Sequence, residues 1–285
     1  MRRQAFLCWL LLLVSTASLA AADLHHLPLG DGKVTTGAAQ RDTVLVCSTA
    51  PFAQGRGAPG SGPWIHGDSF DLDAKPRVEG AVTWPQAHLS ITRSKAARLI
   101  VSNDLPSTPT GSFPIARDSE AFRYDRNPNA IQPQPVQWAL PLRPALAAKP
   151  ICLPPGGPVG LLLDGSYLFN ALDALGRDAA AHEVQDGCYG HPEMRGAYHH
   201  HMLSPCLALG DPQGSSPLLG YALDGFGIYG PYQDGRALSN QDLDECHGLT
   251  SEIEWDGRRT RLYHYVANFE YPYTLGCYRG VPAKR

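Results

Sequence analysis

The sequence predicts a mainly β fold, a sandwich or barrel-like unit with few short helices. The chain of 285 residues contains 29 Gly and 25 Pro, well above the share of about 12% that is usual, and both residues break helices. Its apolar runs are short and bounded by Pro, Gly, Asp and Asn, as strands are. Only 170–182 has a composition compatible with a helix. A helical bundle or a coiled coil is therefore excluded.

Residues 1–22 have the pattern of a signal peptide. Two arginines precede an apolar run over 5–14, and small residues follow over 15–22. The pattern allows cleavage after Ala20 or after Ala22. No later run approaches the 18 apolar residues of a membrane span. We therefore expect an exported protein, periplasmic or secreted, without a membrane span.

The cysteines indicate a disulfide-stapled protein. Cys8 would leave with the signal peptide, so the mature chain would keep an even number, and no CxxC pair is present. An even number of cysteines in an exported chain is typical of a disulfide framework. The six cysteines that would form three disulfides are Cys47, Cys152, Cys188, Cys206, Cys246 and Cys277.

Beyond the signal peptide, composition divides the chain into three segments. Residues 23–62 are expected to form a loose lead-in that ends in a Gly/Pro/Ser tract. Residues 63–150 form an N-terminal β part, with short β-like runs at 80–84 and 98–102. Residues 151–285 form the third segment, in which the sequence repeats itself.

An internal repeat is the most informative feature of this third segment. It predicts two copies of one β unit related by a pseudo-twofold axis. In each copy, the Asp-Gly pair suits a type I′ hairpin turn. The matching pairs are Leu163-Asp164-Gly165 with Leu223-Asp224-Gly225, Asp186-Gly187-Cys188 with Asp244-Glu245-Cys246, Tyr198-His199 with Tyr263-His264, and Cys206 with Cys277.

The repeat allows two symmetric disulfide patterns. One joins Cys188 to Cys206 and Cys246 to Cys277, within each copy. The other crosses between the copies, from Cys188 to Cys277 and from Cys206 to Cys246. Either pattern leaves Cys47 and Cys152 for each other, which would tie the N-terminal part to the repeat.

Several ordered motifs of this chain resemble those of the YHYH domain family of exported proteins. The resemblance covers roughly residues 62–280 and carries no established activity, so the function is argued from the chemistry. The family is named for Tyr-His-Tyr-His, and this chain departs from that motif by having His200 in place of the second Tyr. The motifs are Gly111-x-Phe113-Pro114, Tyr124-Asp125-Arg126-Asn127-Pro128-Asn129, Asp186-x-Cys188-x-Gly190-His191-Pro192, Tyr198-His199-His200-His201, Leu223-Asp224-Gly225-x-x-Ile228-Tyr229-Gly230-Pro231 and Tyr263-His264-Tyr265.

The histidines predict a transition-metal site. His199 and His201 would project from one face of a strand, so both imidazoles could reach one metal ion. His191 lies eight residues earlier, and the pseudo-twofold axis could bring His264, the counterpart of His199, to the same place. The other copy has Leu249 and Val266 where this copy has His191 and His201, which fits one site rather than two. Supporting contacts around the ligands are expected from Asp186, Tyr198 and Tyr263.

We place copper ahead of zinc as the metal. Cleavage after Ala22 would expose Asp23-Leu24-His25, whose amine, amides and third-position imidazole suit Cu(II). Metal binding or handling is the first functional hypothesis, and a metalloenzyme (a hydrolase or an oxidoreductase) using the same histidines is the second. The third is a structural or ligand-binding β module without metal. A net charge of −3 makes nucleic acid an unsuitable partner.

Overall fold

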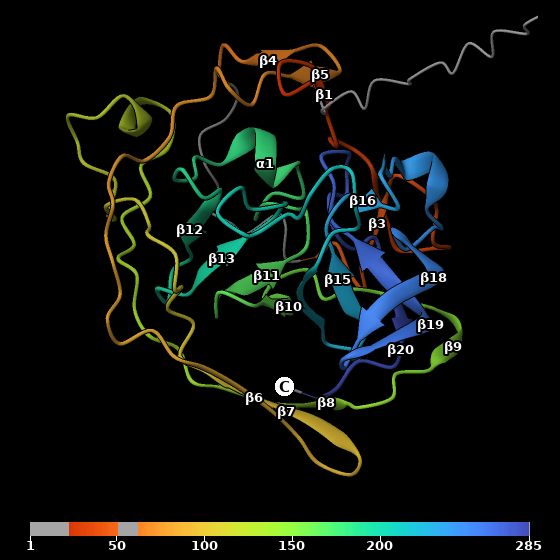
Figure 1. Ribbon diagram of the computed structural model, residues 1–285. Coiled ribbons are helices and arrows are strands. Elements are labelled where there is room, and N and C mark those ends of the chain that lie inside the picture. Colours follow the sequence, from red (N-terminus) through yellow and green to blue (C-terminus); the bar gives the residue numbers. More distant parts are fainter. Residues whose placement is uncertain (1–22, 51–61, 285) are drawn as a thin grey trace, which may run out of the picture.

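A computed structural model describes residues 23–50 and 62–284 and confirms the mainly β fold (Figure 1). The expected signal peptide at 1–22 lies outside the described residues. Within those residues, the one α-helix is α1, Ala179–His182. None of the helices in this part of the chain has both the length and the apolar character that a membrane crossing requires.

An eight-stranded sheet organises the C-terminal half, in the order β12-β13-β11-β10-β14-β15-β19-β18. Figure 1 shows the first four of these strands on one side of the molecule and β15, β18 and β19 on the other. The strands are β10 (Pro158–Leu162), β11 (Tyr167–Phe169), β12 (Gly190–Pro192), β13 (Tyr198–His200), β14 (Leu218–Ala222), β15 (Gly227–Tyr229), β18 (Gly248–Trp255) and β19 (Arg258–Val266).

This strand order contains the predicted repeat. In copy one, β10 and β11 form a hairpin, β11 runs parallel to β13, and β13 pairs antiparallel with β12. In copy two, β14, β15, β19 and β18 repeat the same three relations. The copies meet where β10 pairs antiparallel with β14, with Leu161 opposite Tyr221. The pseudo-twofold axis therefore passes between these two central strands.

The remaining strands form small sheets around the central one. The β6–β7 hairpin extends from the body of the molecule, and β7 pairs with β8 on its other side. These elements are β1 (Leu27–Pro28), β2 (Val34–Thr35), β3 (Val44–Leu45), β4 (Ile65–His66), β5 (Ser69–Phe70), β6 (Leu89–Arg93), β7 (Ala97–Ser102), β8 (Val136–Pro141), β9 (Leu146–Ile151), β16 (Tyr232–Gln233), β17 (Arg236–Ala237), β20 (Tyr278–Gly280) and the 3-10 turns η2 (Ala121–Arg123) and η3 (Asn240–Asp242).

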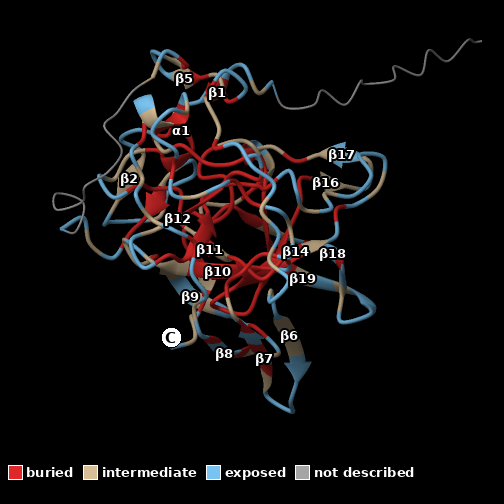
Figure 2. Ribbon diagram, turned by 90° about the vertical axis from the view of Figure 1, so that its left-hand side faces the viewer, coloured by how far each residue is buried: buried red, intermediate tan, exposed pale blue. Residues whose placement is uncertain are grey.

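The described part of the lead-in, residues 23–50, packs against the central sheet instead of lying loose. Val44 and Val46 are fully or almost fully buried in the main core, which Figure 2 shows as the red interior. The apolar run around β3 was available in the sequence, and burying it excludes water from that end of the sheet. The side chain of Trp64 is also buried and donates from Nε1 to the carbonyl of Ala181, on α1.

Three local expectations differ from the structure. The run at 98–102 lies in β7, but 80–84 forms only an isolated bridge between Val82 and Thr110. The segment 170–182 is helical only over α1. Gly165 has a positive φ whereas Asp164 does not, so this hairpin does not use the type I′ turn, which needs both.

The disulfides follow the first of the two predicted patterns, in which each bond lies within one copy. Cys188 is bonded to Cys206 and Cys246 to Cys277, and Cys47 is bonded to Cys152. Cys47 also donates its N–H to the Leu153 carbonyl, 2.9 Å away. The third disulfide therefore fixes the N-terminal segment to the strand region that leads into copy one.

The disulfides should differ in their contribution to stability. Cys47–Cys152 spans 105 residues and Cys246–Cys277 spans 31, so loop-closure entropy gives about 4.7 and about 3.7 kcal/mol. We expect Cys47→Ala/Cys152→Ala to lower the free energy of unfolding by about 1 kcal/mol more than Cys246→Ala/Cys277→Ala, measured by urea denaturation with a metal chelator. Equal losses, or the reverse order, would contradict the chain-entropy argument.

Candidate metal centre

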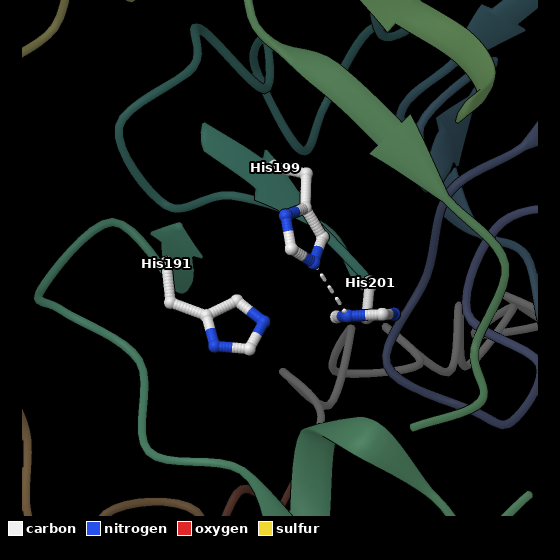
Figure 3. Close-up of side chains that lie close together, drawn as sticks. All are labelled: His191, His199 and His201. Carbon is white, nitrogen blue, oxygen red and sulfur yellow. Dashed lines mark hydrogen bonds between the residues drawn. The ribbon is translucent and has the colours of Figure 1, made fainter. Parts of the chain in front are cut away.

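Three buried histidines converge beside the β12–β13 pair. His191 lies on β12 directly opposite His199 on β13, and His201 follows the end of β13. All three residues are at most 4% exposed. One nitrogen from each lies within 4.8 Å of the others, and Figure 3 shows the three rings around one point. The expected i, i+2 projection from one strand, joined by a neighbouring strand, accounts for this arrangement.

Backbone contacts determine which nitrogens face this point. His199 Nδ1 lies 3.1 Å from the carbonyl oxygen of Ala197, and His201 Nδ1 lies 2.5 Å from that of Asn170. A carbonyl oxygen only accepts hydrogen bonds, so each Nδ1 carries the hydrogen. In the neutral rings, both Nε2 atoms are then lone-pair acceptors.

These two Nε2 atoms lie 3.0 Å apart, the contact drawn as a dashed line in Figure 3. With both hydrogens on Nδ1, no hydrogen remains to place between them. Two lone pairs that face each other repel, and a proton or a metal ion between them removes the repulsion. The geometry of His199 and His201 could therefore accommodate a proton or a metal ion at this point.

Glu183 completes the cluster and was missed in the sequence analysis. Its Oε2 lies 3.3 Å from Nε2 of His191 and 3.3 Å from Nε2 of His201. Oε2 is buried and forms no hydrogen bond. Burial would raise the pKa of Glu183, but the charges and close contacts of His191 and His201 hold it well below its usual range. An ionised carboxylate thus adds an oxygen donor to three nitrogens.

His191 and His199 differ in the direction in which burial and neighbouring charges shift their pKa values. Both ring nitrogens of His191 are buried without a hydrogen bond. Burial lowers the pKa of this ring, but the Glu183 carboxylate beside it raises the pKa above the ordinary value. Burial and the charges of His191 and His201 lower the pKa of His199 well below its ordinary value. His199 therefore stays neutral and able to donate its lone pair at neutral pH.

Contacts from distant segments hold the backbone of Glu183. Glu183 is the C-terminal cap of α1, whose N-cap is Asp178. The Asp178 carboxylate also accepts from the Gly30 N–H at 2.9 Å and from the Tyr273 hydroxyl at 2.7 Å. The buried ammonium of Lys75 donates to the carbonyl of Glu183 at 2.7 Å. The lead-in and copy two thus both hold α1 in place, and Glu183 lies at the C-terminal end of this helix.

One sequence signal could have pointed to Glu183. It directly follows the one segment with helix-compatible composition and precedes His191 by eight residues. A carboxylate at the end of a short helix beside a histidine motif is a reasonable ligand candidate. The contact itself depends on the tertiary structure that brings the C-terminal cap of α1 to His191 on β12, which no local pattern predicts.

Asp186 and Tyr198 serve the scaffold. The Asp186 carboxylate accepts from the backbone N–H groups of Gly111, Cys188 and Gly190 and from the Tyr198 hydroxyl at 2.8 Å. Both oxygens are therefore occupied, and none of these bonds involves an imidazole. Copy two repeats the arrangement, since the Tyr263 hydroxyl donates to Asp244 at 3.0 Å. Tyr263, like Tyr198, supports its strand connection.

The pseudo-twofold axis places His264 far from the trio of His191, His199 and His201. His264 lies on β19, which four strands separate from β13 in the sheet. With about 4.8 Å between neighbouring strands, the separation is on the order of 24 Å. Its ring contacts Tyr229 edge to face. A twofold axis at the centre of the sheet carries the two copies to opposite ends, so the expectation that it would bring His264 to the trio does not hold.

In copy two, the counterparts of the ligands pack as an apolar cluster. Val266 replaces His201 and is fully buried with Leu238 and Leu243, and Leu249, which replaces His191, packs against them. Gln241 has the spacing from its Asp-x-Cys motif that Glu183 has in copy one. Copy two thus forms the same strand arrangement without imidazoles at the positions that correspond to His191 and His201.

Two other expected residues lie away from the trio. His25, of Asp23-Leu24-His25, is exposed and its Nδ1 lies 3.1 Å from an oxygen of Asp71. His200 points toward Asp164, with 3.9 Å between Nε2 and Oδ2. Its counterpart Tyr265 donates to Asp224 at 2.6 Å. His200 is completely buried and belongs to the packing of the sheet.

Asp186→Asn tests whether this carboxylate acts on the fold or on the metal. An amide would point N–H groups at donors, so we expect the free energy of unfolding to fall by about 1–3 kcal/mol. The metal content per folded chain should stay unchanged, measured by mass spectrometry of the purified protein. Asp244→Asn is the matched control in copy two. Loss of metal with unchanged stability would instead assign Asp186 to the metal centre.

The comparisons with known proteins agree with the resemblance seen in the sequence. The family model described as YHYH protein matches residues 137–241, from β8 through copy one to η3. This stretch contains the whole histidine trio and Glu183, and it is shorter than the region of resemblance at 62–280. Neither the curated proteins nor the solved structures include a match to the chain. The matched stretch is less than half of the chain, and over residues 137–241 the chain is similar to the YHYH proteins.

Proposed function

We propose that this YHYH domain binds a transition-metal ion through His191, His199 and His201, with Glu183 as a fourth donor. The observation that carries the proposal is the 3.0 Å approach of the His199 and His201 Nε2 atoms, both left as acceptors by their Nδ1 contacts. Imidazole and carboxylate are common ligands of zinc and of other transition metals.

The contact distances are of the right size for a shared ion. Two ligands about 2.0–2.1 Å from a tetrahedral metal lie roughly 3.3 Å apart. The Oε2 atom of Glu183 lies 3.3 Å from His191 Nε2 and 3.3 Å from His201 Nε2. The approach of His199 to His201 is 3.0 Å. These three contacts are therefore close to the ligand–ligand distance of a tetrahedral site, and within the trio as a whole the ligand nitrogens lie within 4.8 Å of one another.

Copy two argues against a purely structural role for the histidines. The same fold is built there with Leu249 and Val266 in place of His191 and His201. A buried imidazole such as His191, whose ring nitrogens form no hydrogen bond within the described residues, costs stability relative to an apolar side chain. The presence of such imidazoles in copy one is explained by a cation that they bind.

We take zinc and copper as the two candidate metals. Three imidazole nitrogens and a carboxylate oxygen suit zinc and Cu(II). The argument that placed copper first used Asp23-Leu24-His25, and His25 contacts Asp71 rather than the trio. The donor set of the buried centre therefore gives copper no advantage over zinc.

We further propose that the protein works outside the cytoplasm, in the periplasm or after secretion. The three disulfides fit an oxidising compartment. The charged and apolar pattern of residues 1–22 supports a signal peptide. Metal binding or handling in such a compartment is the function that the site supports best.

A metalloenzyme using the same cluster is the second candidate. One observation favours it: Oε2 of Glu183 makes no hydrogen bond although it is buried beside two ligands. A carboxylate in that position can act as a general base instead of a ligand. The two roles differ in what removal of its charge does to metal affinity.

Replacing His191 and His201 by their copy-two counterparts tests the metal site. We expect His191→Leu/His201→Val to fold but to lose its zinc or copper, with affinity weakened more than about a hundredfold because two ligands are gone. Free metal at 100 times its dissociation constant should stabilise the unaltered protein by about 2.7 kcal/mol. That stabilisation should be absent from the variant in chemical denaturation.

A control variant and a second ligand variant accompany this test. His264→Leu removes a buried histidine of copy two and should leave metal content unchanged. His199→Ala/His201→Ala should lose the metal as well. Stoichiometric metal in both double variants, or none in the unaltered protein after zinc and copper are added, would refute the proposal.

Glu183→Gln distinguishes a ligand from a base. The change keeps the shape of the side chain and removes its charge. If Glu183 is a ligand, we expect metal affinity to fall about ten- to a hundredfold, measured by competition with a chromophoric chelator. Unchanged affinity would refute that role and favour the metalloenzyme. Glu193→Gln, at a nearby exposed turn, is the control.

A further inference from the structure

Copy two contains a cavity of about 520 Å³ beside His264. The cavity lies along β14, β15 and β18 and is bordered by the loop that carries Ser215 and Ser216. None of the proposed metal ligands lines it. It is therefore separate from the metal centre and belongs to the other end of the sheet.

His264 is one of the residues that line this cavity. The side chain is 2% exposed, and Nδ1 lies 3.3 Å from the carbonyl oxygen of Leu262. That contact matches the one between His199 and Ala197, each two residues earlier in the strand. Nδ1 therefore carries the hydrogen, and Nε2 is a lone-pair acceptor without a partner among the described residues.

The lining carries an excess of negative charge. It includes the acidic residues Asp234, Glu252, Glu254 and Asp256, but only one basic residue, Arg259. Asp256 already contacts the guanidinium groups of Arg93 and Arg98. Of the other three, Glu254 lies opposite Arg259 and Glu252 lies opposite Arg261 in the β18–β19 pair. Among the residues that line the cavity, carboxylates still outnumber guanidinium groups, which favours a positively charged guest.

Aromatic rings in the lining add a second attraction for cations. Tyr221, Tyr229 and Tyr232 all border the cavity. The ring of Tyr221 already has the Arg98 guanidinium 4.4 Å from its centroid. Ring faces of this kind attract ammonium and guanidinium groups. The carboxylates and the ring faces would attract a positively charged ligand. An N–H group of that ligand could be donated to Nε2 of His264.

We propose that this cavity binds a small organic amine in its protonated form, with an ammonium N–H donated to His264 Nε2. The carboxylates of the lining supply the charge, and the tyrosines pack against the carbon chain. The proposal does not rest on metal binding, because the cavity shares no residue with the metal centre.

The experiment titrates the full-length mature protein, with metal chelated, with putrescine. Isothermal calorimetry measures affinity, and NMR of ¹³C-labelled histidine follows the His264 ring. Tetramethylammonium, which is cationic but has no N–H, and glucose, which is neutral, are the comparison probes. We expect putrescine to bind best, to shift the His264 resonance and to weaken with added salt.

Two variants locate the binding. Glu252→Gln/Glu254→Gln should weaken putrescine binding at least about fivefold, because two charges near the cavity are lost. Asp118→Asn/Glu120→Gln, an exposed pair remote from the cavity in the sequence, should leave it unchanged. His264→Phe keeps a ring but removes the acceptor and should abolish the preference for putrescine over tetramethylammonium.

Several results would overturn the proposal. They are no binding of putrescine, stronger binding of glucose, equal binding of tetramethylammonium and putrescine by the unaltered protein, or an unshifted His264 resonance. Equal weakening in both double variants would assign the effect to overall charge and would overturn it as well. The His191→Leu/His201→Val protein should bind putrescine normally, so failure of the metal proposal leaves this one standing.

Discussion

The antiparallel pairing of β10 with β14 is the constraint on which the rest of the structure depends. Gly160 and Gly220 occupy equivalent positions there, and a Cβ on either would collide with the carbonyl of the facing strand, Tyr221 or Leu161. Only glycine permits this close approach of two backbones. With the centre fixed, each copy adds its strands outward, so the two chemically different ends of the sheet lie far apart.

The two copies show how one strand arrangement accommodates two kinds of chemistry. In both, the first histidine of the motif keeps its Nδ1 on a carbonyl two residues earlier. The neighbouring side chains differ between the copies. Copy one has His191, His201 and Glu183, whereas copy two has an apolar cluster around Val266. The backbone therefore orients the imidazole, and the neighbouring side chains decide what its free nitrogen meets.

The sequence was informative where function depends on repeated local patterns. The mainly β fold followed from the Gly and Pro content and the short apolar runs, and the repeat and the i, i+2 projection of His199 and His201 followed from spacing. The contact of Glu183 could not be predicted, because it depends on tertiary contacts of α1 and its C-terminal cap, such as those made by Lys75 and Asp178. His264 was misplaced because the position of a symmetry axis is a property of the assembled sheet.

The energetics of copy one indicate what the cluster is for. Glu183 Oε2 and both ring nitrogens of His191 are buried without hydrogen bonds, and each such group costs roughly 1–3 kcal/mol. Copy two reaches the same topology without that cost, through Leu249 and Val266. The facing lone pairs of His199 and His201 repel each other, and these nitrogens and the Glu183 carboxylate would all be attracted to one cation. An ion bound as proposed above would give these buried groups a partner and so remove that cost.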